Sequence, residues 1–212
     1  MNRYQAVAVF FLVLSFGLIN LPAAYADIIE GKDYTVLAKP QPTEDNSKIE
    51  VLEFFWYGCP HCYSLHPQLK TWLANIPADV NFQYVPAILR PTWVPAAKIF
   101  YAIEAMGIAG TLHDKVYDAI HRDKIDLNNE SVLFDWIEKQ GIDRKKFENT
   151  YQSFAVQNQV SRSTQMSRQY QLNGVPTLII NGKYLTSGRM GGSPQDTIKT
   201  LEALLEKVRK EK

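Results

Sequence analysis

The chain has 212 residues, of which 46% are hydrophobic, and it carries 23 lysine and arginine residues against 22 aspartate and glutamate residues. This near-neutral balance predicts no basic surface of the kind that binds nucleic acid or anionic membrane, so we expect no nucleic-acid partner. The length suits one domain, or one domain with an inserted subdomain, and can bury a core without disulfide staples.

The N-terminal segment has the pattern of a secretory signal peptide. Arg3 gives a basic start, the apolar run AVAVFFLVLSFGLI covers residues 6–19, and small residues stand at Ala24 and Ala26. We predict export, with cleavage after about Ala26. The alternative, an uncleaved membrane anchor, is disfavoured because 14 apolar residues fall short of the roughly 20 that span a bilayer. Cleavage removes Arg3 and no acid, leaving 186 residues with 22 basic and 22 acidic side chains.

The first part of the exported chain predicts strands around one helix. A strand is expected around DYTVL, residues 33–37, before the linker AKPQPTEDNSK. The run IEVLEFFWY, from Ile49 to Tyr57, is too continuously apolar to have one wet face, so we expect a central strand covered on both sides. After Gly58 the apolar residues follow helical spacing, and VNFQYVPA, residues 80–87, predicts the next strand.

Residues 91–170 predict a helical subdomain inserted into the sheet domain. Apolar side chains recur there at helical spacing, and Asn129 and Asp143 are placed to cap the third and fourth helices. Such stripes are more typical of a packed core than of a cofactor site. The sheet domain is therefore assigned to residues 27–90 and 171–212.

Strand patterns resume after the helical segment. VPTLIIN, an Asn181–Gly182 turn and KYLTSG together predict a hairpin. From the residues alone the Val175–Pro176 bond is expected to be trans, since only about 5 to 6% of X-Pro bonds in folded proteins are cis. Pro176 also opens a strand, a position where its missing N–H is tolerated.

The last segment, SPQDTIKTLEALLEKVRK, predicts a helix with a strong start. Ser193 is placed as the N-cap, Pro194 as the first helical residue and Asp196 as the partner in a capping box. The complete order is strand, strand, helix, strand, helical segment, strand, strand, helix. This order predicts an α/β fold with a sheet of about five strands and an inserted helical subdomain.

Cys59 and Cys62, in the stretch FFWYGCPHCYS, are the only cysteines of the chain. In an oxidising compartment, proteins that need disulfide staples usually have several pairs far apart in sequence. A clip across four residues removes only about 2 kcal/mol of unfolded-chain entropy, against about 4.7 kcal/mol for a loop of 100 residues. The pair is therefore better suited to redox chemistry than to a structural role.

A metal site is the other alternative for this stretch. Zinc sites need four ligands, and the CPHC stretch together with His66 offers four candidates. No second C-x-x-C exists, however, and His113 and His121 fall in the helical segment, so we predict no metal site. The three histidines outside CPHC are expected to be surface or locally hydrogen-bonded side chains.

The junction between strand and helix makes the two cysteines unequal. Cys59 falls at a helix N-terminus, where unpaired N–H groups and the helix dipole stabilise a thiolate and lower the thiol pKa. Pro60 suits the first helical turn. Cys62 lies one turn further on and deeper, and is expected to be the resolving thiol, which re-forms the disulfide with Cys59. A protonated His61 adds positive charge that favours the thiolate, the alternative being a solvated turn residue. A stabilised thiolate favours the reduced form and makes the disulfide a better oxidant.

Glu53 is the second informative residue. It stands among apolar neighbours in VLEFF, where an unpaired carboxylate is costly. Burial raises a carboxyl pKa, so Glu53 is a candidate to take and return the proton of Cys62 during exchange. The alternative is a glutamate at an opening of the sheet that pairs with a lysine.

These residues resemble the DsbA family of periplasmic thiol:disulfide oxidases, which belong to the thioredoxin superfamily. The resemblance rests on the signal peptide, on VLEFFWYGCPHCYSLHP, on the long helical insertion and on NGVPTLIINGKYLTSG. It covers nearly all of the exported chain, and CPHC with a GVP-plus-strand segment at this distance is highly specific. It implies a thioredoxin fold in which the insertion forms a helical cap over the active site.

The resemblance also implies roles for four residues. Cys59 is the exposed nucleophile and Cys62 the resolving thiol. Pro176 is then a cis-proline beside the disulfide. Val175 lines the same surface, where an extended substrate peptide can pair with backbone groups.

Two further positions follow from the resemblance. Glu53 matches the buried acid beneath the active site, and the Thr177 hydroxyl is a candidate to tune the thiolate. The family often places a lysine near this acid from the following strand, where this chain has Gln83. Glu53 is therefore expected to lack a charged partner.

We predict a periplasmic disulfide oxidase, in which a substrate thiolate attacks the oxidised pair at Cys59 and forms a mixed disulfide. The alternatives are a reductase or isomerase of the same fold, and a peptide-binding chaperone with incidental cysteines. Isomerases of this compartment usually carry a dimerisation domain, for which 186 residues leave no room, so we expect a monomer. The implied partners are reduced exported polypeptides and a DsbB-like quinone-linked membrane oxidase, and no cofactor is expected.

Overall fold

The computed structural model describes residues 27–211, so the predicted signal peptide and its cleavage site lie outside the described residues. Five strands form one mixed sheet in the order β1-β5-β4-β2-β3, in which only β2 and β3 are parallel. The strands are β1 Thr35–Val36, β2 Ile49–Phe55, β3 Val80–Pro86, β4 Thr177–Ile180 and β5 Tyr184–Ser187. The predicted α/β fold with a five-stranded sheet is confirmed.

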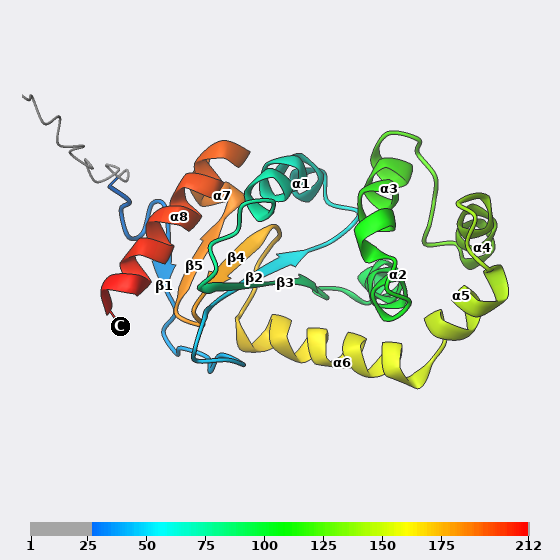
Figure 1. Cartoon of the computed structure of the whole chain (residues 1–212), viewed down its shortest axis with the longest axis horizontal. Coiled ribbons are helices and arrows are strands. Elements are labelled where there is room, and N and C mark those ends of the chain that lie inside the picture. Colours follow the sequence, from blue (N-terminus) through cyan, green and yellow to red (C-terminus); the bar gives the residue numbers. More distant parts are fainter. Residues whose placement is uncertain (1–26, 212) are drawn as a thin grey trace, which may run out of the picture.

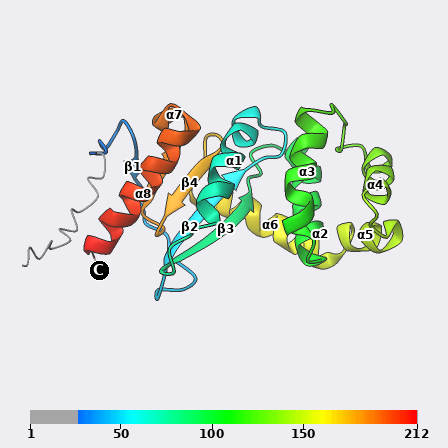
Figure 2. The same ribbon diagram turned by 45° about the horizontal axis from the view of Figure 1, so that its top comes forward.

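Helices cover both faces of this sheet and extend it at one end. Figure 1 shows α1 and α8 on one side, α6 on the other, and α2 to α5 beyond the end of the sheet. The helices are α1 Pro60–Leu73, α2 Val94–Ala105, α3 Ala109–His121, α4 Glu130–Lys139, α5 Arg144–Tyr151, α6 Phe154–Gln169, α7 Gly188–Gly191 and α8 Pro194–Glu211, with a 3₁₀ turn η1 at Pro91–Trp93. Figure 2 shows the same separation between the sheet and α2 to α5. None of the described helices is both long and apolar enough to cross a membrane.

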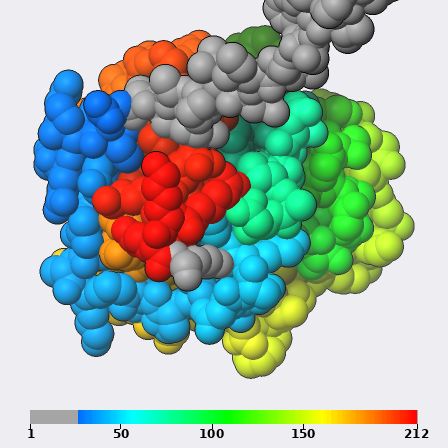
Figure 3. Space-filling view, turned by 60° about the vertical axis from the view of Figure 1, so that its left-hand side comes forward, coloured from blue at the N-terminus to red at the C-terminus, as the bar shows by residue number. Residues whose placement is uncertain are grey.

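The central strand β2 is buried along its whole length, as its continuous apolar run predicts. Alternate side chains of β2 point to opposite faces. Val51 packs in a core with side chains of α1 and α8, whereas Leu52 and Phe54 pack in a second core with Tyr170 at the end of α6. Figure 3 shows α8 lying against α1 on the outer surface of the first core. Each fully buried side chain of this size stabilises the fold by about 1.5 to 3 kcal/mol.

A third apolar core joins the helices α2 to α5 to the start of α1. It holds Phe55 at the end of β2, Tyr57 in the turn that follows, both cysteines, and the inward faces of the inserted helices. The insertion is therefore packed directly against the strand-to-helix junction.

The predicted helix starts are confirmed. Asn129 and Asp143 accept backbone N–H bonds as N-caps of α4 and α5. The Ser193 Oγ accepts the N–H of Asp196 at 3.1 Å and donates to the Asp196 carboxylate at 2.6 Å, which completes the predicted pairing at the start of α8.

Several elements differ from the sequence prediction, and β1, β4 and β5 are each shorter than the strand expected there. The central strand ends at Phe55 rather than Tyr57, because the Cys59 N–H bonds to the Trp56 carbonyl and turns the chain. The predicted fourth helix is two helices, since Ser153 caps a new one by accepting the Val156 N–H at 3.2 Å. The short helix α7 was not predicted, because a four-residue segment shows no helical periodicity.

The β4–β5 turn generates a stability prediction. Asn181 and Gly182 both have positive φ, 52° and 61°, and a Cβ on Gly182 would lie 2.1 Å from the Gln41 carbonyl oxygen. We expect Gly182→Ala to lower the free energy of unfolding by about 1 to 3 kcal/mol, measured by urea denaturation. Gly110→Ala, on α3 with open space around its Cβ, is the matched control and should raise it by about 0.5 to 1 kcal/mol. Equal effects of the two substitutions would contradict the close approach at Gln41.

Candidate active site

A tight turn between β2 and α1 fixes the position of Cys59. The Cys59 N–H bonds to the Trp56 carbonyl at 2.9 Å, and Pro60 is the first residue of α1. Gly58 is required between them, because a Cβ there would lie 2.3 Å from the Trp56 ring. That ring is held by Trp93, on which it stacks at 4.4 Å between centroids and 2° between planes. Cys59 is thus the N-cap residue of α1, as predicted.

The surroundings of Cys59 favour its thiolate. Its pKa is lowered to about 6 from an ordinary value of 9.0, first by a hydrogen bond from the Cys62 thiol. Burial opposes this shift, and the backbone N–H groups of Cys62 and His61 together with the charge of His61 add to it. The donors are those that a helix N-terminus leaves unpaired.

Cys62 lies deeper and behaves in the opposite way. It is 0% exposed, against 8% for Cys59, and burial together with the neighbouring Cys59 raises its pKa well above the ordinary value. The expectation of an exposed Cys59 is therefore correct only relative to Cys62, because Cys59 is itself buried in an apolar cluster against which Val175 packs. The two thiols are both free in this structure, which is the reduced form of the pair.

The loop before β4 lies against Cys59. The Val175–Pro176 bond is cis, as the resemblance implied and as the general frequency of such bonds did not. The Cys59 thiol donates to the Val175 carbonyl oxygen at 3.4 Å. The Thr177 hydroxyl donates instead to the Gly174 carbonyl at 2.9 Å, so its predicted tuning of the thiolate has no direct contact behind it and stays a prediction.

Glu53 is buried in the middle of β2, with 1% of its surface exposed. Burial first, and the charge of Cys59 second, raise its pKa to about 8. Tyr84, and not Gln83, is its neighbour on β3 in register. Gln83 pairs with the preceding residue and donates to Glu44 at 3.1 Å, so it does not occupy the position of a partner for Glu53. Within residues 27–211, Glu53 makes no ion pair, and the expected lack of a charged partner stays a prediction.

Two histidines of α3 bind the segment just before the cysteines. His113 Nδ1 shares a 2.6 Å hydrogen bond with the Tyr57 hydroxyl, and His121 Nε2 lies 2.7 Å from the Tyr57 carbonyl. His121 also stacks on the Tyr63 ring at 4.7 Å. The prediction of surface or locally bonded histidines is wrong for both, since His113 is 6% exposed and the two rings bond to Tyr57, which lies 56 and 64 positions away in the chain.

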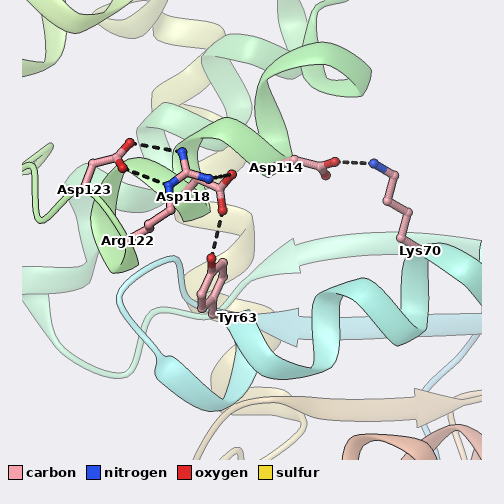
Figure 4. Close-up of polar contacts among 6 residues, drawn as sticks. All are labelled: Tyr63, Lys70, Asp114, Asp118, Arg122 and Asp123. Carbon is pink, nitrogen blue, oxygen red and sulfur yellow. Dashed lines mark hydrogen bonds and ion pairs between the residues drawn. The ribbon is translucent and has the colours of Figure 1, made fainter.

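The outer faces of α1 and α3 are joined by polar contacts (Figure 4). The Tyr63 hydroxyl donates to Asp118 at 2.8 Å, and Lys70 pairs with Asp114. The buried His66 bonds to the same Asp114 at 2.7 Å, so it too is neither a surface nor a local residue. These contacts hold the helix of the cysteines against the insertion. In the part of the chain that the structure describes, no cluster of three or more histidine, cysteine or acidic side chains could hold a metal ion.

The comparisons with known proteins agree with this geometry. A family model described as a DSBA-like thioredoxin domain matches residues 79–203. The chain belongs to this family. The thiol:disulfide interchange protein DsbA of Pseudomonas aeruginosa is 38% identical over 192 residues, covering 91% of each chain, and that of Burkholderia cepacia is 37% identical over 204 residues, covering 95% of this chain and 96% of the relative.

Solved structures of DsbA proteins share the whole fold. The crystal structure of Pseudomonas aeruginosa DsbA superposes with a TM-score of 0.81 at 38% identity, covering 85% of this chain and 94% of that one. The oxidoreductase NmDsbA1 of Neisseria meningitidis superposes with a TM-score of 0.77 at 31% identity, covering 86% and 95%. The predicted thioredoxin fold with a helical insertion and the resemblance to the DsbA family are both confirmed.

Sequence reasoning missed several residues that shape this DsbA-like site. The Trp56–Trp93 stack and the bonds of Tyr57 to His113 and His121 join residues that are far apart in the chain. The presence of two histidines eight residues apart on one predicted helix was the available signal. It does not indicate which partner they contact, so it could not find these bonds.

The causes of the Cys59 pKa generate a prediction with an internal order. Thiolate absorbance near 240 nm in the reduced protein should titrate with a midpoint near pH 6. Cys62→Ala removes the strongest stabilising bond and should raise this midpoint more than His61→Ser does, because the histidine acts only through its charge. Cys59→Ala, which removes the titrating group, is the control. A midpoint near 9 in the unsubstituted protein would contradict the assignment.

The Glu53 pKa generates a second prediction. Between pH 4.5 and 8 the folded state holds a proton that the unfolded state has lost, so stability falls as pH rises through this window. Glu53→Gln removes this dependence on pH. The free energy of unfolding of the variant minus that of the unsubstituted protein should therefore be about 2 to 4 kcal/mol larger at pH 8 than at pH 4.5. Urea denaturation of the oxidised forms measures it. The exposed Glu202→Gln is the control, and an unchanged difference between the two pH values would exclude a buried, protonated Glu53.

Proposed function

We propose that this DsbA-family chain is a thiol:disulfide oxidoreductase that donates its Cys59–Cys62 disulfide to reduced, newly exported polypeptides. The observation that carries the proposal is the lowered pKa of Cys59 beside a buried Cys62 of raised pKa. Stabilising one thiolate favours the dithiol over the disulfide, so the disulfide is readily passed on. A reductase needs the opposite balance.

In the proposed reaction a substrate thiolate attacks the Cys59 sulfur of the oxidised pair. The Cys59–Cys62 bond breaks, the electron pair goes to Cys62, and a mixed disulfide joins Cys59 to the substrate. A second substrate thiolate then attacks the substrate sulfur, forms the substrate disulfide and releases the Cys59 thiolate. Two electrons pass to the protein. Cys59 is the better leaving group because its pKa is the lower of the two.

The groups around the pair are assigned supporting roles in this proposal. The Cys62 thiolate forms in a buried site, and Glu53, protonated at neutral pH by its raised pKa, is the acid that supplies its proton. Pro60 and His61 begin α1 and set the pKa of Cys59. The Thr177 hydroxyl holds the loop beside Cys59 through its bond to the Gly174 carbonyl, and its proposed tuning of the thiolate acts through that loop.

The substrate is proposed to bind as an extended segment along Val175 and Pro176. The Val175 carbonyl accepts a hydrogen bond from the Cys59 thiol. A substrate cysteine that forms a disulfide with Cys59 therefore lies beside this backbone. Backbone pairing of this kind is indifferent to side chains and suits many substrates. Residues 91–170 are proposed to form the opposite wall as one helical subdomain.

The setting of the reaction follows from the proposed export. We place the protein in the periplasm as a monomer, with cleavage after about Ala26, and re-oxidation by a DsbB-like quinone-linked membrane oxidase. Family membership supports the first of these, and a pair that is reduced in every turnover needs an oxidant to restore its disulfide.

The decisive experiment follows disulfide formation in a reduced, unfolded polypeptide. The oxidised protein should form disulfides, whereas Cys59→Ala and Cys62→Ala, neither of which can hold the Cys59–Cys62 disulfide, should both abolish the reaction. The equilibrium with glutathione separates an oxidase from a reductase, whose disulfide would be held much more tightly. Protection of unfolded proteins that survives replacement of both cysteines, without disulfide transfer, would favour the chaperone alternative.

A further inference from the structure

The arginines of the described chain fall into two groups. Four of the seven between residues 27 and 211 form ion pairs, and these are Arg122, Arg144, Arg162 and Arg209. The other three make no ion pair and no side-chain hydrogen bond to any described residue, and all are exposed; these are Arg90, Arg168 and Arg189. Unpaired guanidinium groups are available to an external partner.

The three unpaired arginines flank the loop that carries the cis-proline. Arg189 lines a cleft of about 140 Å³ together with His61, Val175 and Pro176. Gly188, the residue before it, is in reach of Pro176, with its Cβ position 3.6 Å from the proline ring. One side of the proposed substrate path is therefore basic.

A second cleft borders the residues that lead into the same loop. It has a volume of about 490 Å³ and is lined by Arg90 and Arg168. It ends at residues 171 and 172, whereas the first cleft begins at residues 173 and 174. The two clefts are thus consecutive along one stretch of backbone. No aspartate or glutamate lines either of them, although the chain as a whole is close to neutral.

We propose that these clefts select substrate segments that carry carboxylates near the reacting cysteine. Arginine binds carboxylates through two parallel N–H bonds, and three such groups without internal partners pay no cost of breaking an existing pair. At an exposed rim the gain falls mainly on the rate of association, and it weakens as salt is added. The inference rests on the proposed function, because it assigns a preference within disulfide donation.

The test compares two reduced peptides, each with two cysteines, flanked by glutamates in one and by glutamines in the other. Oxidation by the oxidised protein is followed at low ionic strength. Each rate is divided by the rate of the same peptide with a small neutral disulfide, which corrects for the effect of glutamates on the peptide's own thiols. We expect the glutamate peptide to react about ten-fold faster and this ratio to fall as salt rises.

The triple variant Arg90→Gln, Arg168→Gln, Arg189→Gln should reduce the ratio to about one by slowing the oxidation of the glutamate peptide. The control Lys139→Gln, Lys145→Gln, Lys146→Gln makes the same change of net charge on exposed residues of α4 and α5, at the far end of the molecule, and should keep the ratio. Thermal denaturation verifies that both variants fold. The single variant Arg189→Gln shows how much of the preference for the glutamate peptide comes from the cleft beside Pro176 and how much from the cleft of Arg90 and Arg168.

Three outcomes would overturn the inference. Equal rates for the two peptides in the unsubstituted protein would remove the preference. If the ratio of the two rates falls equally in the arginine variant and in the lysine variant, the preference comes from net charge alone. Binding to phosphatidylglycerol vesicles that the arginine variant alone loses, with equal peptide rates, would assign the arginines to a membrane surface. If the unsubstituted oxidised protein oxidises neither the glutamate peptide nor the glutamine peptide, the proposed function itself is contradicted.

Discussion

The first turn of α1 is the constraint on which the rest of the site depends. A helix begins with N–H groups that have no partner within it, and here the Cys59 sulfur is held beside two of them. The strand that leads into this turn is buried on both faces, so packing fixes the direction of the chain there. The Gly58 turn under the Trp56 ring sets how strand and helix meet. The reactivity of one sulfur is thus fixed by how a strand gives way to a helix.

The insertion is part of the same machinery rather than a neighbour of it. Tyr57 is bonded by two histidines of α3, one on its hydroxyl and one on its carbonyl, directly before the cysteines. Tyr63 and Lys70 fasten the outer face of α1 to α3 as well. Burial that these helices supply also raises the pKa of the groups beneath. The insertion, which packs in one apolar cluster with both cysteines, therefore contributes to the burial that raises the Cys62 pKa.

Local patterns in the sequence were sufficient for most of the fold. The apolar run of β2, the Asn181–Gly182 turn and the caps at Asn129 and Ser193 act within a few residues, so their structure could be predicted. The inequality of the cysteines also follows from local position. What could not be predicted depends on tertiary contacts: the bonds of His113, the register that sets Tyr84 beside Glu53, and the depth of Cys59. The cis bond was expected only through the family resemblance.

The pairing of β2 with β4 has a consequence for how the chain is made. Residues 51–54 of β2 bond to residues 177–180, and the whole helical insertion lies between them in sequence. A chain that is synthesised from its N-terminus can form α1 and the inserted helices from contacts close in sequence. At that stage the edge of β2 that pairs with β4 is still without its partner strand. The loop that covers Cys59 arrives with β4. The active centre is consequently among the last parts of the molecule to be assembled, and until then Cys59 lacks the contact with Val175 that the folded protein gives it.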